Sequence, residues 1–152
     1  MTPGTLTDPD TDAVEVGVKF RADSNGVITG LRFYKGAGNT GTHVGHLWAA
    51  NGTLLATATF TNETASGWQQ VSLATPVAVT ANTTYVASYY APVGRYSVDD
   101  NFFAASGVDN QPLHALANGL DGPNGVYRYG SGGGFPTSSF AASNYWVDVV
   151  FS

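Results

Sequence analysis

Three alternating apolar segments between residues 27 and 60 constrain the fold of this chain more than any other feature. They cover residues 27–34, 43–49 and 54–60, and each is bounded by glycine-rich or Asn-Gly sequences. In the first segment Val27, Thr29, Leu31 and Phe33 alternate with Ile28, Gly30, Arg32 and Tyr34, which is the period of a β-strand with one buried face. The pair at 51–52 is Asn-Gly, the strongest signal for a two-residue type I′ hairpin turn. The stretch therefore predicts a three-stranded antiparallel meander.

The rest of the chain shows the same period and no helical one. Further strands are expected at 14–20, 68–73, 77–79, 82–91, 126–129, 135–140 and 145–151. Residues 92–125 have no sustained period, so we expect an ordered loop there, with a helical turn near 113–116 as one alternative. Short strands separated by turn signals indicate an all-β fold, a jelly-roll-like antiparallel β-sandwich. We expect a single domain at 13–152, preceded by a polar tail or linker at 1–12.

Composition narrows the class of protein. Only 11% of the residues are charged, 19 of the 152 are glycine, none is cysteine and the net charge is −5. A negative chain with few cations does not suit a nucleic-acid partner, and no apolar run approaches the roughly 20 residues of a membrane-spanning helix. The balance is typical of secreted β-rich modules. Because residues 1–12 lack the pattern of a signal peptide, we expect the chain to be a piece of a longer exported protein.

Several segments carry a resemblance to a known family. FYKGAGNTGTHVGHLW, TLLATATFTNETASGWQQV, NTTYVASYYAP, GVYRYG and NYWVDVVF resemble successive signatures of the domain of unknown function 4082 family, from about Val14 to Phe151. The resemblance implies a β-sandwich accessory module of secreted, multidomain bacterial proteins, beside immunoglobulin-like or enzymatic domains. It implies no activity. Members of the family often read YHAPNGHY where this chain reads YYAPVGRY, so a role for those histidines would not extend to Tyr90 and Arg95.

Nothing in the sequence indicates catalysis strongly. It has no nucleophile elbow, no zinc-protease motif and no phosphate-binding loop followed by a helix. A glycosidase needs two carboxyl groups across a cleft, and Asp99-Asp100 is the adjacent acidic pair in the long loop. We therefore expect no enzyme, and keep a hydrolase that uses loop carboxylates as the third alternative.

Candidate metal ligands are few. His43 and His46 are three residues apart, so a regular strand would point them to opposite faces. Glu15 and Asp148 stand opposite the valines of the first and last predicted strands. If these strands meet, both carboxylates can hold a structural calcium ion together with backbone carbonyls. The alternative is a pair of solvated strand carboxylates.

Aromatic residues give the richest functional signal. The chain has eight tyrosines and three tryptophans, many of them beside polar or turn positions. Aromatic rings stack on sugar rings, and neighbouring polar side chains bond the hydroxyl groups. The leading hypothesis is a non-catalytic carbohydrate-binding module whose partners are a glycan and the other domains of its parent protein; the alternative is a structural spacer or adhesion module without a small ligand. The predicted ligand-binding residues are Tyr34, His46, Trp48, Tyr90, Arg95, Tyr96 and Arg128.

Overall fold

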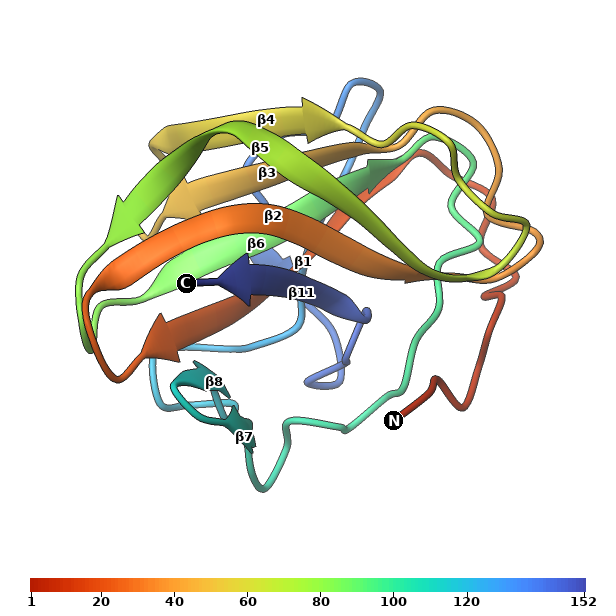
Figure 1. Cartoon of the computed structure of the whole chain (residues 1–152). Coiled ribbons are helices and arrows are strands. Elements are labelled where there is room, and N and C mark those ends of the chain that lie inside the picture. Colours follow the sequence, from red (N-terminus) through yellow and green to blue (C-terminus); the bar gives the residue numbers. More distant parts are fainter.

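The protein is built of two antiparallel β-sheets that pack face to face (Figure 1). The structure, a computed structural model, describes all 152 residues. Its strands are β1 (Val14–Ala22), β2 (Gly26–Lys35), β3 (Val44–Ala49), β4 (Leu54–Thr59), β5 (Gly67–Val79), β6 (Tyr85–Ala91), β7 (Val108–Asn110), β8 (Leu113–Ala115), β9 (Val126–Tyr129), β10 (Ser138–Ser139) and β11 (Val147–Phe151). The prediction of an all-β sandwich of antiparallel strands is confirmed. No helix is long and apolar enough to cross a lipid bilayer.

The two sheets differ greatly in width. The larger has the order β10-β9-β1-β6-β3-β4, with β8 also paired to β1 and β7 to β8, whereas the smaller has the order β11-β2-β5. Alternate residues of facing strands fill the space between the sheets. Phe33 of β2 stacks on Tyr89 of β6 with ring centroids 4.2 Å apart, and Phe60 meets Phe33 edge-on at 4.8 Å. These buried rings join the two layers.

The predicted three-stranded meander is wrong in its first strand. The hairpin of β3 and β4 around Asn51-Gly52 forms. Its turn is not the expected two-residue type I′ turn, because Gly52 has a positive φ and Asn51 does not. Strand β2 pairs with β5 and β11 in the other sheet. The glycine-rich segment 36–43 therefore carries the chain from one layer to the other. Leu31 and Phe33 are buried as the alternation predicts. A period of two identifies the buried face of a strand, but it does not determine which strand lies beside it.

A bulge changes the phase of β2 and β5. The register shifts between Ile28 and Gly30, whose partners on β5 are Val77 and Ser72. Ile28 is consequently buried with Leu31, in contrast to the predicted alternation. The extra residues of β5 include Pro76, which an edge strand at a bulge accommodates because it lacks an N–H donor. The two short strands expected at 68–73 and 77–79 are thus one strand.

Strand β1 pairs with different strands along its two edges. One side pairs with β6 throughout, whereas the other pairs first with β9 and then with β8. The gap between these two ladders is closed by the buried side chain of Asn124. Its Oδ1 accepts from the Lys19 backbone N–H at 2.9 Å, and its Nδ2 donates to the Lys19 and Leu116 carbonyls at 3.1 and 2.7 Å. A side chain therefore replaces a strand at this point of the sheet.

The long segment after β6 is ordered and packs on the sandwich. Phe103 and Leu116 are buried, and residues 113–115, where a helical turn was an alternative, form the strand β8. The first 12 residues also differ from the expected free tail. Thr5 makes a β-bridge to Val98, and the Asp8 N–H donates to the Tyr96 carbonyl at 2.9 Å. Backbone hydrogen bonds hold this polar segment where apolar side chains are scarce.

Candidate functional site

Four of the predicted binding residues share the outer face of the larger sheet. His46 and Trp48 belong to β3, Tyr90 to β6 and Arg128 to β9. Their neighbours along each strand, such as Leu47, fill the core. The structure therefore brings these four residues to one face, in agreement with the predicted strand phase.

That face is covered by the protein itself. The glycine-rich segment 130–137, between β9 and β10, lies over it, and Phe135 packs on Trp48 with ring centroids 5.4 Å apart. Trp48 is only 8% exposed and forms a small apolar cluster with Val86 and Val126. Trp48 offers no open platform to a sugar ring in this arrangement.

Beneath the same segment lies a buried polar network. The Trp48 Nε1–H donates to Ser88 Oγ at 2.8 Å, and the Ser88 hydroxyl donates to Glu15 Oε2 at 2.6 Å. His46 Nδ1 binds the same oxygen at 2.7 Å. Glu15 is fully buried, its Oε1 has no hydrogen-bond partner, and the backbone of Gly133 closes over that oxygen. Because the serine proton points to the carboxylate and not to an imidazole, the group is not arranged as an activated nucleophile.

The other predicted binding residues lie elsewhere. Tyr34 is on the smaller sheet, where its ring meets Trp68 edge-on at 5.4 Å. Arg95 and Tyr96 follow β6 in the loop, and Tyr96 packs edge-on against Tyr145 at 5.3 Å. The seven predicted residues therefore do not form one binding surface.

The two carboxylates proposed to share calcium also lie apart. Glu15 points out of the larger sheet, between Val14 and Val16 of the core. Asp148 points out of the smaller sheet, between Val147 and Val149, because β11 pairs with β2 and not with β1. Side chains on opposite outer faces of a sandwich cannot bind one ion. No group of three or more His, Cys, Asp or Glu side chains is placed to hold a metal.

His43 has a structural position at one end of the sandwich. It is fully buried, and it contacts Glu63 through Nδ1 at 2.8 Å and Asn39 through Nε2 at 2.7 Å. Asn39 Nδ2 in turn donates to the Tyr89 hydroxyl at 3.1 Å, and Lys35 Nζ lies 3.1 Å from Glu63. Burial lowers the pKa of His43, and the carboxylate of Glu63 opposes this effect in part. The His43 ring packs on Phe33 and Tyr89 of the core, whereas His46 lies on the outer face of the larger sheet, so the two histidines point to opposite faces as expected.

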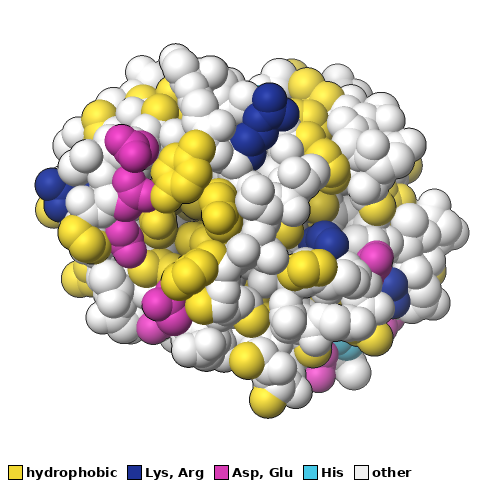
Figure 2. Space-filling model, turned by 180° about the vertical axis from the view of Figure 1, so that it is seen from behind, with side chains coloured by type: hydrophobic (Ala, Val, Ile, Leu, Met, Phe, Trp, Pro, Cys, Tyr) yellow, Lys and Arg dark blue, Asp and Glu magenta, His cyan; other side chains and the backbone are white.

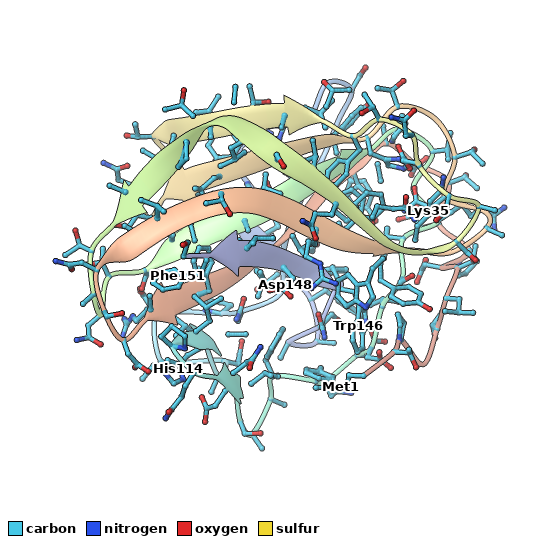
Figure 3. The ribbon with its side chains drawn as sticks, viewed as in Figure 1. Met1, Lys35, His114, Trp146, Asp148 and Phe151 are labelled. Carbon is cyan, nitrogen blue, oxygen red and sulfur yellow. The ribbon has the colours of Figure 1, made fainter.

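A further cavity lies between β11 and the hairpin of β7 and β8. This tryptophan cleft has a volume of about 470 Å³. One wall carries Trp68, Trp146, Phe102, Arg32 and Asp148, and the hairpin contributes Asp109, Asn110 and His114. In Figure 3, Asp148 and Trp146 lie at β11 and just before it, and His114 lies on the hairpin side. Most of its lining residues are apolar, with polar groups at the rim.

Trp146 is held in the cleft by an unusual backbone conformation. Its φ is +58°, which is a rare and strained value for a bulky side chain. The Trp146 N–H donates to Asn144 Oδ1 at 2.8 Å, and the indole Nε1–H donates to Asp99 Oδ2, also at 2.8 Å. Asp99 therefore positions an aromatic ring and is not part of an open carboxylate pair. Strain of this kind is retained where the surroundings fix it, which is common at binding sites.

Charge and aromatic surface meet on the same wall. The Arg32 guanidinium lies 4.5 Å from the Trp68 ring centroid and 3.4 Å from Asp148 Oδ2. Arg32 Nε has no hydrogen-bond partner. Burial raises the pKa of Asp148, whereas the hydrogen bond that it accepts from the Val149 N–H and the positive charge of Arg32 both act to lower it. Trp68 is 36% exposed whereas Trp146 is 5% exposed. Trp68 is thus the tryptophan that a ligand can reach.

Comparison with known families agrees with the sequence signatures. The sequence model of a family described as "Domain of unknown function (DUF4082)" matches residues 1–147. The chain belongs to this family. No curated protein matches it. The DUF4082 match includes the first 12 residues, which the structure shows bound to the rest of the domain.

Sequence reasoning missed most of the tryptophan cleft of this DUF4082 domain. The sequence shows aromatic or charged residues beside polar positions at Arg32, Trp68 and Trp146. They belong to three different elements, since Arg32 is in β2, Trp68 is in β5 and Trp146 directly precedes β11. Only the order β11-β2-β5 places them together. The one available signal was alternation, since Arg32 and Asp148 both occupy the outward phase of valine-rich or leucine-rich strands and pair directly in register.

Proposed function

We propose that this chain is a non-catalytic carbohydrate-binding module and that the tryptophan cleft holds the sugar. The observation that carries the proposal is the cleft wall, where Trp68 and Phe102 present aromatic surface beside the polar pair Arg32 and Asp148. Sugar rings bind proteins by stacking apolar C–H faces on aromatic rings while hydroxyl groups exchange hydrogen bonds with polar side chains. Both parts are present within one cavity of a size suited to a small ligand or a short segment of a chain.

The charges of the cleft favour a neutral glycan. Arg32 and Asp148 pair with each other, so the wall carries a donor and an acceptor with little net charge. The opposite wall adds Asp109, which contacts His114 Nδ1 at 2.6 Å. The chain as a whole carries −5. A polyanionic polysaccharide would be repelled, whereas an uncharged one would find stacking surface and hydrogen-bonding partners.

Composition supports secretion, and the family resemblance supports a multidomain parent protein. Low charge and abundant glycine are typical of exported β-rich modules. In such a protein the module would hold its parent near a polysaccharide while other domains act. This part of the proposal is tested by locating the parent protein in culture supernatant against cell lysate; retention inside the cell would refute it.

The binding test uses the purified chain. A glycan array selects a neutral ligand, and affinity electrophoresis in gels containing that polysaccharide then measures retention. Trp68→Ala is expected to weaken retention about tenfold, since one stacked ring contributes about 1.4 kcal/mol. Leu120→Ala, which removes an exposed apolar side chain outside the cleft, should leave retention unchanged.

Two outcomes would contradict the proposal. Equal loss from both variants would show that retention reflects general apolar adsorption. Absence of retention on every neutral polysaccharide would favour the alternative of a structural spacer or adhesion module without a small ligand.

A further inference from the structure

A second cleft forms where the larger sheet extends past the smaller one. Tyr127 and Tyr129 of β9 lie opposite Val16 and Val14 of β1, so they point to the inner side of the larger sheet. The three strands of the smaller sheet do not reach this end, because β9 and β10 are at the far edge of an order that is twice as long. The inner side of β9 is therefore bordered by loops instead of a facing sheet.

The N-terminal segment and the loop after β6 complete this tyrosine cleft. It has a volume of about 330 Å³ and is lined by Asp8, Asp10, Val14, Val16, Tyr96, Tyr127, Tyr129 and Phe140. Tyr129 and Phe140 are 50% and 62% exposed, so the aromatic surface is open to solvent. Figure 2 shows a hollow lined with hydrophobic side chains, with acidic groups along one side of its rim.

The carboxylates at the rim have no cationic partner. Neither Asp8 nor Asp10 forms an ion pair with a Lys, Arg or His side chain, and none of the lining residues is basic. The two Asp residues bring two negative charges beside three tyrosine rings. The faces of such rings also carry negative electrostatic potential. A cation in this cleft would be attracted by both.

The hydrogen bonds of the carboxylates indicate which kind of cation fits. Asp8 Oδ1 accepts from the Asp10 N–H, and Asp10 Oδ1 accepts from the Asp12 N–H, both at 2.9 Å. Asp10 Oδ2 accepts from the Tyr129 hydroxyl. Three of the four oxygens thus already accept one hydrogen bond, which leaves fewer free lone pairs for a primary ammonium, a guanidinium or a metal ion without removing them all. A quaternary ammonium makes no hydrogen bonds and requires only negative charge and aromatic faces.

We propose that the tyrosine cleft binds a quaternary ammonium group, with the rings of Tyr96, Tyr127 and Tyr129 around its methyl groups and the carboxylates of Asp8 and Asp10 as counter-charge. The Tyr129 phenol remains neutral in this role, because the hydrogen bond to Asp10 raises its pKa to about 12. This site is separate from the tryptophan cleft, with which it shares no lining residue. It adds a second class of ligand to the proposed glycan.

The test compares choline with its uncharged analogue 3,3-dimethylbutan-1-ol, which has the same shape. Binding to the purified chain is followed by calorimetry and by NMR of the tyrosine rings at 150 mM salt. Choline is expected to bind at one site with a dissociation constant in the millimolar range, and the neutral analogue at least about fivefold more weakly, since the cation–ring attraction is lost. Equal binding of the two compounds, or no saturable binding of choline, would overturn the proposal.

Substitutions in the tyrosine cleft test which of its residues bind choline. Tyr129→Leu, which keeps an apolar side chain without a ring, and Asp10→Asn, which keeps an acceptor without the charge, should each weaken choline binding about three- to tenfold. Asp12→Asn is the matched control, because Asp12 carries the same charge in the same segment but does not line the cleft. Unchanged melting temperatures would establish that the variants fold. If Asp12→Asn weakens binding as much as Asp10→Asn, the effect is one of general charge and the assignment is wrong.

Discussion

The strongest prediction from the fold concerns Trp48. The sequence suggests an exposed ligand contact at this position, whereas the structure shows a buried side chain that packs under segment 130–137. Its indole is 8% exposed, contacts Phe135 and donates to Ser88 Oγ. Trp48→Ala removes roughly 150 Å² of buried apolar area, or about 4 kcal/mol at about 25 cal/mol per Å². The lost hydrogen bond adds about 1 kcal/mol. Relaxation of segment 130–137 into the vacated space restores part of the lost stability, so the free energy of unfolding should fall by about 3 to 5 kcal/mol.

Urea denaturation at 25 °C measures this difference. With a slope of about 2 kcal/mol per molar urea, the midpoint should fall by about 2 M while the slope stays constant. Trp48→Phe, which keeps a ring but no N–H donor, should lose about 1 to 2 kcal/mol. Leu55→Ala on the exposed strand β4 is a control with a loss below about 1 kcal/mol. A loss below about 1 kcal/mol for Trp48→Ala would show that segment 130–137 does not cover the indole in solution, and would restore Trp48 as a candidate ligand contact.

Three further predictions concern buried polar groups. Gly133→Ala should lower the free energy of unfolding by about 1 to 3 kcal/mol in the same urea assay, because a Cβ would lie 2.2 Å from Glu15 Oε1 at a φ of +74°; a neutral result would show that the segment can lift. Asn124→Ala should cost about 1 to 3 kcal/mol, since the Lys19 N–H loses its acceptor. Asn124→Asp should cost at least as much, because its second oxygen would face the Lys19 and Leu116 carbonyls without a proton to donate. His43 has a lowered pKa in the folded state, so the unfolded state binds more protons and stability should fall as the pH decreases below about 6.5. His43→Gln should remove that part of the slope between pH 7.5 and 5, and parallel pH profiles would contradict the assignment.

The sequence predicts the class of fold because the alternation of apolar and polar residues in β1, β2 and β6 depends only on the period of two within each extended segment. Val14, Val16 and Val18 must share a face if the segment is extended, and they do. The sheet to which β2 belongs depends on contacts between distant segments, so Asn-Gly at 25–26 and at 51–52 look alike although only the second closes a hairpin. The same limit applies to the site. The outward phase of His46 and Trp48 was predictable, whereas the cover supplied by Phe135 was not, since the glycine-rich residues 130–134 carry no signal beyond that of a hairpin connection.

The division of β1 between three partner strands also sets the order in which the chain can fold. Phe20 pairs with Tyr85 and Ala115, and Val14 pairs with Ala91 and Tyr129. The first strand to be synthesised therefore has no partner until much later residues have emerged, which at about 5 to 20 residues per second means a delay of several seconds to tens of seconds. During that time its row of valines is exposed and prone to pair with other chains. Strand β1 therefore completes its two ladders only after β6, β8 and β9 have been synthesised.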